Sequence, residues 1–280
     1  MSMRLFIGGA RGSRPAIGAA FSEFGGDTTS LLVVGSRGER LVLDAGTGMY
    51  AVAGQLAAGG PGDVAVLLSH YHLDHVMGLT MNPLFYKSGW AFRLAGPMFA
   101  DGGVREAVNR LLSPPYWPIT CDRMSARMTF AEFPATEMAL GSLRVRGLRI
   151  PHPGGCLAYR IDDTDNGGSL VYATDLEWAS RTPAQETEFL TLCRDGGGAD
   201  GLFIDAHFAR ADAKVFAGMG HTCWEDCVEI AESAGVRRLL LAHHAPDADD
   251  GVLRALEKKA KDRAANAELA RAGQWLAITD

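Results

Sequence analysis

The sequence predicts an α/β fold, because short apolar segments alternate with longer segments of helical periodicity along most of the chain. Its composition agrees: 47% of the 280 residues are hydrophobic and 21% are charged, as in an ordinary globular protein. A chain of this length buries enough surface to fold without disulfides. Since no linker separates two compositions and no short repeat is evident, we expect one domain over residues 1–280.

The first half of the chain contains several strand candidates around one clear helix. Short runs of Leu, Val, Ile and Phe predict strands at 4–7, 31–34, 41–44, 64–68 and 92–95. The small-residue segment 49–58 predicts a helix that ends at Gly59-Gly60-Pro61, because Gly and Pro stop helices. Residues 104–112 predict a second helix. Residues 113–127 are rich in Pro and fit neither period, which predicts an ordered loop that either contacts substrate or packs aromatic side chains on the surface.

The second half repeats the alternation. Strands are expected at 143–150, 158–161, 170–173, 202–205 and 239–242. Helices are expected at 183–193 and 224–234, followed by a terminal helix from about residue 250. The turn residues 163–168 between two strand candidates predict a hairpin.

Charge and cysteine usage exclude several classes of function. A net charge of −6 and a pI near 5.8, without a basic block, argue against a dedicated nucleic-acid or membrane-surface binder. No apolar run approaches the ~20 residues of a membrane helix, and the N-terminus lacks the apolar segment of a signal peptide. The five cysteines are odd in number and scattered, so we expect free structural thiols in a cytoplasmic protein.

The strongest chemical signal is the motif Ser69-His70-Tyr71-His72-Leu73-Asp74-His75, directly after the strand 64–68. Imidazole and carboxylate groups are ligands for zinc, iron and manganese. In a loop that turns into a helix, His70 and His72 can point one way while Asp74 and His75 point another. The motif therefore predicts a metal site, and its geometry suits two metals side by side.

This His-x-His-x-Asp-His motif resembles the signature of the metallo-β-lactamase superfamily. The resemblance implies an α/β fold of the αββα type, a four-layer sandwich of two mixed β-sheets flanked by helices. It also implies further ligands at the ends of later strands, and the chain offers His152, Asp175 and His243 in matching order. The early element Leu43-Asp44-Ala45-Gly46 is similar to one in which the aspartate braces the ligand loops.

The resemblance implies a role for each of these side chains. It assigns His70, His72 and His152 to one metal and Asp74, His75 and His243 to the other, with Asp175 bridging. Two divalent ions are expected, zinc by default, with manganese or iron as alternatives. A hydroxide held between them would attack the substrate.

Gly220-His221-Thr222 and the later His243 are similar to elements of the ribonuclease Z and phosphodiesterase branch, in which the first histidine is catalytic. His221 is thus a candidate to protonate the leaving group, and the alternative is a structural neighbour of a helix cap at Thr222. Asp74 is a second catalytic candidate, as a proton acceptor. Members of the branch that process tRNA carry a long basic arm between the third His and the bridging Asp, and here His152 and Asp175 lie too close for one.

Four further polar residues have no firm role in the sequence. His207 and His244 are extra histidines near expected strand ends, and His244 is more typical of a bracing or structural residue. Arg11 and Arg14 lie in a glycine-rich loop, where they either bind a substrate phosphate or stay solvated.

The leading hypothesis is a dinuclear metal-dependent phosphodiesterase acting on a small anionic substrate, such as a cyclic nucleotide or nucleotide derivative. The same site could instead hydrolyse a lactone, thioester or other carbonyl ester, and a metal-stabilised regulatory binding protein is a third hypothesis. Large structured RNA and membranes are not expected as partners, and a homodimer is compatible with the sequence.

Overall fold

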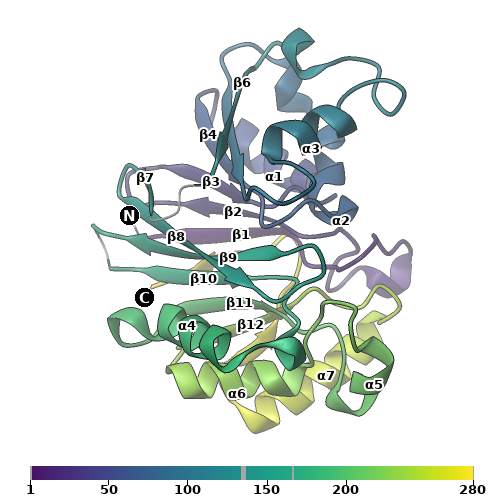
Figure 1. The fold of residues 1–280 in the computed structure, drawn as a ribbon, viewed down its shortest axis with the longest axis vertical. Coiled ribbons are helices and arrows are strands. Elements are labelled where there is room, and N and C mark those ends of the chain that lie inside the picture. Colours follow the sequence, from purple (N-terminus) through teal and green to yellow (C-terminus); the bar gives the residue numbers. More distant parts are fainter. Residues whose placement is uncertain (1, 134–136, 166, 280) are drawn as a thin grey trace.

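The computed structural model describes residues 2–133, 137–165 and 167–279. Two seven-stranded sheets pack face to face, and helices cover the outer face of each sheet (Figure 1). Across the first sheet the strand order is β14 (Trp275–Ala277), β1 (Arg4–Gly9), β2 (Ser30–Val34), β3 (Arg40–Leu43), β4 (Asp63–Leu67), β5 (Ala91–Gly96) and β6 (Arg127–Glu132). Across the second it is β13 (Ala267–Leu269), β12 (Arg238–Ala242), β11 (Gly201–Asp205), β10 (Ser169–Ala173), β9 (Cys156–Asp163), β8 (Leu143–Ile150) and β7 (Met138–Leu140).

Both sheets are mixed in the same way. In the first sheet the pairs from β14 to β3 are antiparallel and those from β3 to β6 are parallel. In the second sheet the pairs from β7 to β10 are antiparallel and those from β10 to β13 are parallel. The expected αββα sandwich with two mixed sheets is confirmed.

Each sheet has its own helices. On the first sheet α1 (Met49–Ala58) packs on β1 and β2, and α3 (Val104–Leu111) packs on β5 and β6, while the short α2 (Leu73–Val76) follows β4. On the second sheet α4 (Pro183–Arg194), α6 (Trp224–Ala234) and α7 (Asp250–Arg263) form the outer layer, and the short α5 (Ala213–Phe216) lies in the loop after β11. Figure 1 shows these two helical layers on opposite sides of the strands.

Strand β2 shows why these apolar runs become strands. Leu31 and Val33 pack into the core between the two sheets, whereas Leu32 packs against the helices outside. Successive side chains of a strand point to opposite faces, so a strand buried on both faces needs a continuous apolar run. The core between the two sheets therefore consists of every second side chain of the central strands.

Every strand and helix that the sequence predicted is present, with ends shifted by at most two residues. The six-residue strand β6 and the three-residue strands β7, β13 and β14 were not predicted. The hairpin between β9 and β10 is confirmed, although Asn166 in its turn lies outside the described residues. Residues 113–120 form turns, as expected of the loop. Within the described ranges, no helix has the length and apolarity needed to cross a bilayer.

Candidate metal centre

The centre lies at one edge of the sandwich, where loops after strands of both sheets meet. The loop after β4 carries the motif from His70 to His75, and the ends of β8, β10 and β12 are followed by His152, Asp175 and His243. Parallel strands end at the same edge of a sheet, so side chains just beyond them converge. The structure brings all seven expected ligands together in two groups that meet at Asp175.

We call His70, His72 and His152 the open set. Their ligand nitrogens and a carboxylate oxygen of Asp175 all lie within 4.8 Å of one another. His152 Nε2 is 3.1 Å from His72 Nδ1, while His70 Nε2 is 3.5 Å from Asp175 Oδ2. The side chains of His70 and His152 are each only 2% exposed, whereas His72 is exposed, so this set faces solvent at His72.

We call Asp74, His75 and His243 the enclosed set, because all three are buried. His75 Nε2 and His243 Nε2 lie 3.2 and 3.5 Å from Asp74 Oδ2. The same two nitrogens lie 3.0 and 2.9 Å from Asp175 Oδ1. Asp175 therefore turns one carboxylate oxygen to each set, which is the arrangement that a bridging ligand needs.

The donor atoms fit divalent ions. The Nε2 atoms of His70, His75 and His243 are buried and make no hydrogen bond, although carboxylate oxygens lie close by. A buried polar atom without a hydrogen bond is costly, so such atoms require another partner. Imidazole nitrogens and carboxylate oxygens aimed at common points are the donor set of zinc, manganese or iron.

Asp44 braces the motif, as the sequence predicted. Its carboxylate is fully buried and accepts hydrogen bonds from the Ser69 amide and hydroxyl at 2.6 Å and from the Tyr172 hydroxyl at 2.5 Å. It also lies 2.8 Å from His75 Nδ1. A carboxylate accepts, so His75 donates from Nδ1, and its Nε2 faces the site. His152 is oriented similarly by the Gly220 carbonyl, 3.0 Å from its Nδ1.

Backbone conformation also marks the centre. Among the described residues, four other than glycine have a left-handed backbone, and three of them are Asp44, Asp175 and His243, with φ of 55–56°. Each stands at or just beyond the end of a central strand. This conformation is unfavourable for residues other than Gly, Asn and Asp and tends to occur at functional sites. At each of these positions the left-handed backbone makes the chain leave its strand next to the site.

In the metal-free protein the pKa values of two histidines in the open set and two in the enclosed set are shifted in opposite directions. Burial lowers the pKa of His70 and His152, and neighbouring imidazoles such as His75 beside His70 act in the same direction. Burial also disfavours charge on His243, but Asp175 outweighs it and raises the pKa of His243 to about 10. The pKa of His75 is raised in the same way, because Asp175 and Asp74 outweigh its burial.

His221 lies beside the metal centre with a carboxylate partner. Its Nδ1 is 2.9 Å from Asp205 Oδ2, so Nδ1 donates and Nε2 remains free to exchange a proton. The rings of His221 and His243 are 4.8 Å apart, and those of His221 and His152 are 6.3 Å apart. The alternative of a helix-cap neighbour is not supported, because Thr222 donates to Leu176 and accepts from the Trp178 amide instead of capping α6.

The sequence assigned no role to Asp205. Its position offered a signal, since it ends β11, which lies between the strands that precede Asp175 and His243. His207, two residues later, stacks on His221 with ring centroids 4.3 Å apart and its Nδ1 donates to the His243 carbonyl. Burial lowers the pKa of His207 to about 4, which keeps this ring neutral.

The remaining candidates lie outside the site. Arg11 is only 1% exposed and donates to the carbonyl oxygens of Gly25, Ala245 and Ala248, so it is neither solvated nor free to bind a phosphate. Arg14 pairs with Asp247 on the surface. The buried His244 donates to the Ala270 carbonyl and is structural, as expected.

Comparisons with known proteins agree with this geometry. The sequence profile of the family described as "Beta-lactamase superfamily domain" matches residues 39–244. The chain is 23% identical over 259 residues to the ribonuclease Z of Clostridium acetobutylicum, covering 78% of this chain and 82% of that protein. It is 27% identical over 184 residues to the probable metallo-hydrolase YhfI of Bacillus subtilis, covering 64% of this chain and 65% of that protein.

Solved structures show the same fold. The metallo-β-lactamase fold protein YhfI from Bacillus subtilis superposes with a TM-score of 0.69 at 21% identity and 99% coverage of both chains. A diphosphatase from the PhnP family superposes with a TM-score of 0.71 at 19% identity, covering 98% of this chain and 97% of that one. From the family match, the shared fold and the His/Asp cluster, this chain belongs to the metallo-β-lactamase superfamily and is a metal-dependent hydrolase.

Proposed function

We propose that the protein is a dinuclear phosphodiesterase that acts on a small phosphodiester, such as a cyclic nucleotide or nucleotide derivative. The observation that carries the proposal is Asp175, whose two oxygens face two separate sets of ligands. Two adjacent divalent ions suit an in-line displacement at phosphorus. One relative is named a ribonuclease, and ribonucleases as a class cleave phosphodiester bonds.

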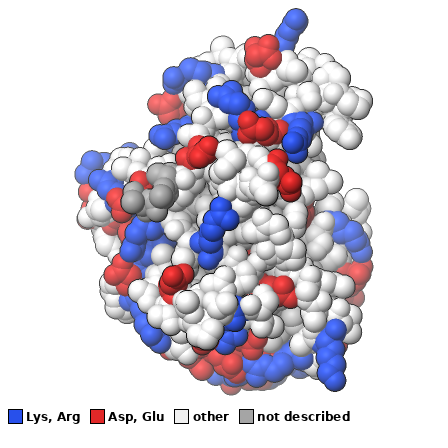
Figure 2. Space-filling view, in the orientation of Figure 1, with Lys and Arg blue, Asp and Glu red and all other residues white. Residues whose placement is uncertain are grey.

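A small substrate is favoured over structured RNA. The described residues between His152 and Asp175 form β9, β10 and short connections, so the segment is too short to include an RNA-binding arm. Acidic and basic side chains are interspersed over the face shown in Figure 2, rather than forming a basic track for a polyanion there. The net charge of −6 is consistent with this proposal, because the bound ions would supply local positive charge for a small anion.

In this proposal the open set would hold one ion and the enclosed set the other, with Asp175 contributing to both. When bound, the two ions lower the pKa of water and offset negative charge on the phosphoryl oxygens. His221 donates a proton from Nε2 to the leaving alcohol oxygen. Asp205 fixes the orientation of the His221 ring through the hydrogen bond to Nδ1, as a carboxylate does beside a catalytic imidazole. Zinc is the expected ion for the three-histidine open set, whereas the carboxylates of the enclosed set also suit manganese or iron.

The test compares ester classes on the purified protein after zinc, manganese or iron is restored. We expect hydrolysis of bis(p-nitrophenyl) phosphate to exceed that of p-nitrophenyl carboxylic esters, relative to their uncatalysed rates. Failure to hydrolyse any phosphodiester would refute the proposal, and faster hydrolysis of the carboxylic esters would point to the carbonyl-ester alternative.

His221→Asn tests the proton donor, because asparagine can keep the hydrogen bond to Asp205 but cannot transfer a proton. With a poor leaving group, such as an alkyl alcohol, we expect kcat to fall by about 10²–10⁴-fold. With p-nitrophenolate the loss should be much smaller, since this anion leaves without a proton. Metal content should remain unchanged, and an equal loss on both substrates would remove His221 from this role.

A further inference from the structure

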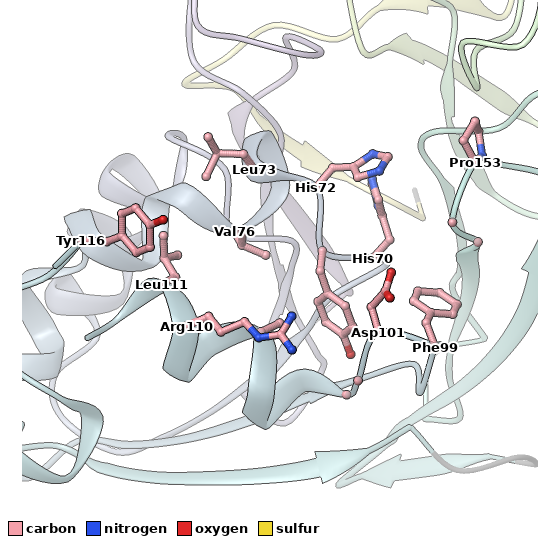
Figure 3. A pocket seen from close by; sticks show the side chains of 16 residues that line it. His70, His72, Leu73, Val76, Phe99, Asp101, Arg110, Leu111, Tyr116 and Pro153 are labelled. Carbon is pink, nitrogen blue, oxygen red and sulfur yellow. The ribbon is translucent and has the colours of Figure 1, made fainter. Parts of the chain in front are cut away.

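A large cavity of about 510 Å³ opens beside the open set (Figure 3). His70 and His72 form one side of it, so the cavity is continuous with the metal centre. Its size lies in the range of roughly 300–1,000 Å³ that is typical of small-molecule sites. The reaction proposed above uses only the metal-centre side, which leaves the rest of the cavity without a role.

One wall of the cavity is a rigid aromatic corner. The Tyr71 hydroxyl donates to the Pro97 carbonyl at 2.5 Å, and the rings of Tyr71 and Phe99 meet edge to face, 6.0 Å apart. Two glycines make room for these rings: a Cβ at Gly155 would lie 2.8 Å from the Phe99 ring, and one at Gly96 would lie 2.8 Å from the Tyr71 hydroxyl. The corner is therefore formed by the fold before any ligand arrives.

The facing wall is apolar and open to solvent. It contains Leu73, Val76, Leu111 and Tyr116, and Figure 3 shows these side chains grouped on the side away from Phe99. Leu73 is 59% exposed and Tyr116 is 77% exposed. Clustered exposed apolar side chains at the mouth of a cavity mark a ligand-binding surface.

Two charged side chains complete the lining. Arg110 reaches from α3 into the cavity, and Asp101 lies on the side toward Phe99 (Figure 3). A guanidinium and a carboxylate can hydrogen-bond the polar edge of a heterocycle whose faces lie against aromatic rings.

The position of His221 decides which part of the substrate enters this cavity. His221 lines a different cavity of about 250 Å³, together with Phe208 and Phe216. The group that leaves must lie near the proton donor, on the His221 side. The large cavity is then available to the ester group that remains on phosphorus.

We propose that the cavity between Tyr71, Phe99 and Tyr116 binds a flat heteroaromatic group, such as a nucleobase, on the ester arm that remains attached to phosphorus. This inference rests on the proposed phosphodiesterase function and adds its substrate selectivity. Stacking of one base on an aromatic side chain is worth about a tenfold or greater change in binding.

The test uses the metal-restored full chain and three phosphodiesters that share the p-nitrophenolate leaving group. Water adds to phosphorus, the bond to p-nitrophenolate breaks, and the methyl, hexyl or thymidine-5′ phosphate monoester remains. Since all three retained groups are alkyl esters, their intrinsic reactivity is similar. We expect kcat/KM to be at least about tenfold higher for the thymidine ester than for the methyl ester, and higher than for the hexyl ester.

Substitutions of the aromatic side chains test whether the preference for the thymidine ester arises in this cavity. Phe99→Ala and Tyr116→Ala should lower the thymidine-to-methyl ratio of kcat/KM several-fold, and Tyr50→Ala, which changes an exposed tyrosine on α1, should not. Phe99→Leu keeps apolar bulk without a flat face, so it should lower the rate on the thymidine ester more than that on the hexyl ester.

Each contrary outcome has a distinct meaning. Absence of turnover on all three esters would overturn the proposed function and this inference with it. Turnover with a thymidine-to-methyl ratio near one would overturn this inference alone. A hexyl ester as good as the thymidine ester, or a ratio unaffected by Phe99→Ala and Tyr116→Ala, would also overturn it.

Discussion

The open set and the enclosed set use similar side chains in opposite surroundings. The open set, His70, His72 and His152, contains imidazoles alone and faces solvent and the large cavity. The enclosed set, Asp74, His75 and His243, is buried and contains a carboxylate, and Asp44 braces it from behind. In the metal-free protein the pKa of His70 and His152 is lowered, whereas that of His75 and His243 is raised.

This difference separates two tasks that one site must combine. The buried carboxylates hold positive charge firmly in the enclosed set, and this set is tied to the core through Asp44 and Tyr172. The open set has less negative charge and lines the large cavity, so under the proposed function a substrate would approach from this side. Asp175 is the residue whose carboxylate lies close to both sets.

Replacing Asp175 should have the largest effect. Asparagine tolerates the left-handed backbone at this position, so Asp175→Asn removes the charge without adding backbone strain. We expect both ions to be lost or weakly held and activity to fall by about 10³-fold or more, as measured by metal analysis and initial rates. Retention of one tightly bound ion with near-normal activity would show that the two sets work independently.

Replacing one histidine in each set should have similar effects on metal binding but different effects on the free energy of unfolding. His72→Ala and His243→Ala should each remove about one equivalent of metal. In the metal-free protein, urea unfolding should change by no more than about 0.5 kcal/mol for the exposed His72. His243→Ala should cost about 3 kcal/mol or more, because it removes one of the two imidazoles that offset the buried charges of Asp74 and Asp175 and leaves His75 as the other. Equal costs would contradict the contrast between the sets.

Asp44→Asn should affect the enclosed set selectively. The amide keeps the left-handed backbone but weakens the hold on His75 Nδ1, and loss of such a brace lowers metal affinity or activity by roughly 10–100-fold. A titration with zinc should show one weakened site and one unchanged site. Weakening of both sites to the same degree would show that Asp44 acts through the whole loop.

The two sets should also give the metal-free protein opposite pH dependences, which is the smallest effect. For His243 the folded-state pKa, about 10, lies above the unfolded value of ~6.5, so its stabilisation is complete below pH 6.5 and is lost as the pH rises toward 10. For His70 and His152 the folded-state pKa is lowered, so stability is lost as the pH falls below about 6.5.

Urea midpoints of the EDTA-treated protein from pH 4 to 10 would measure both limbs, with a slope of at most about 1.4 kcal/mol per pH unit for each group. His243→Gln should flatten the alkaline limb and spare the acid limb. An unchanged alkaline limb in that variant would assign the effect to other residues.

Much of this site could be predicted from the sequence, because its ligands stand directly after apolar strands whose pattern is clear. The motif at His70–His75 and the positions of His152, Asp175 and His243 needed only strand ends and a family resemblance. Asp205 was missed because its partner, His221, comes from a different loop, and their contact exists only in three dimensions.

Other features depend on information that no local pattern carries. The strands β13 and β14 have three residues each, too few to show a period, and they form by pairing with β12 and β1. Arg11 has the residue type and loop of a phosphate ligand, but folding buries it against three backbone carbonyls. Tertiary packing determines both the formation of β13 and β14 and the burial of Arg11.

The wide spacing of the ligands has a consequence for biosynthesis. The first motif ends at His75, but the centre is incomplete until His243 has also been synthesised. At a synthesis rate of 5–20 residues per second, this interval lasts roughly ten seconds or more. During that time the nascent chain displays His70, His72 and His75 without their later partners. A complete set of ligands therefore exists only after His243, near the end of the chain, has been made.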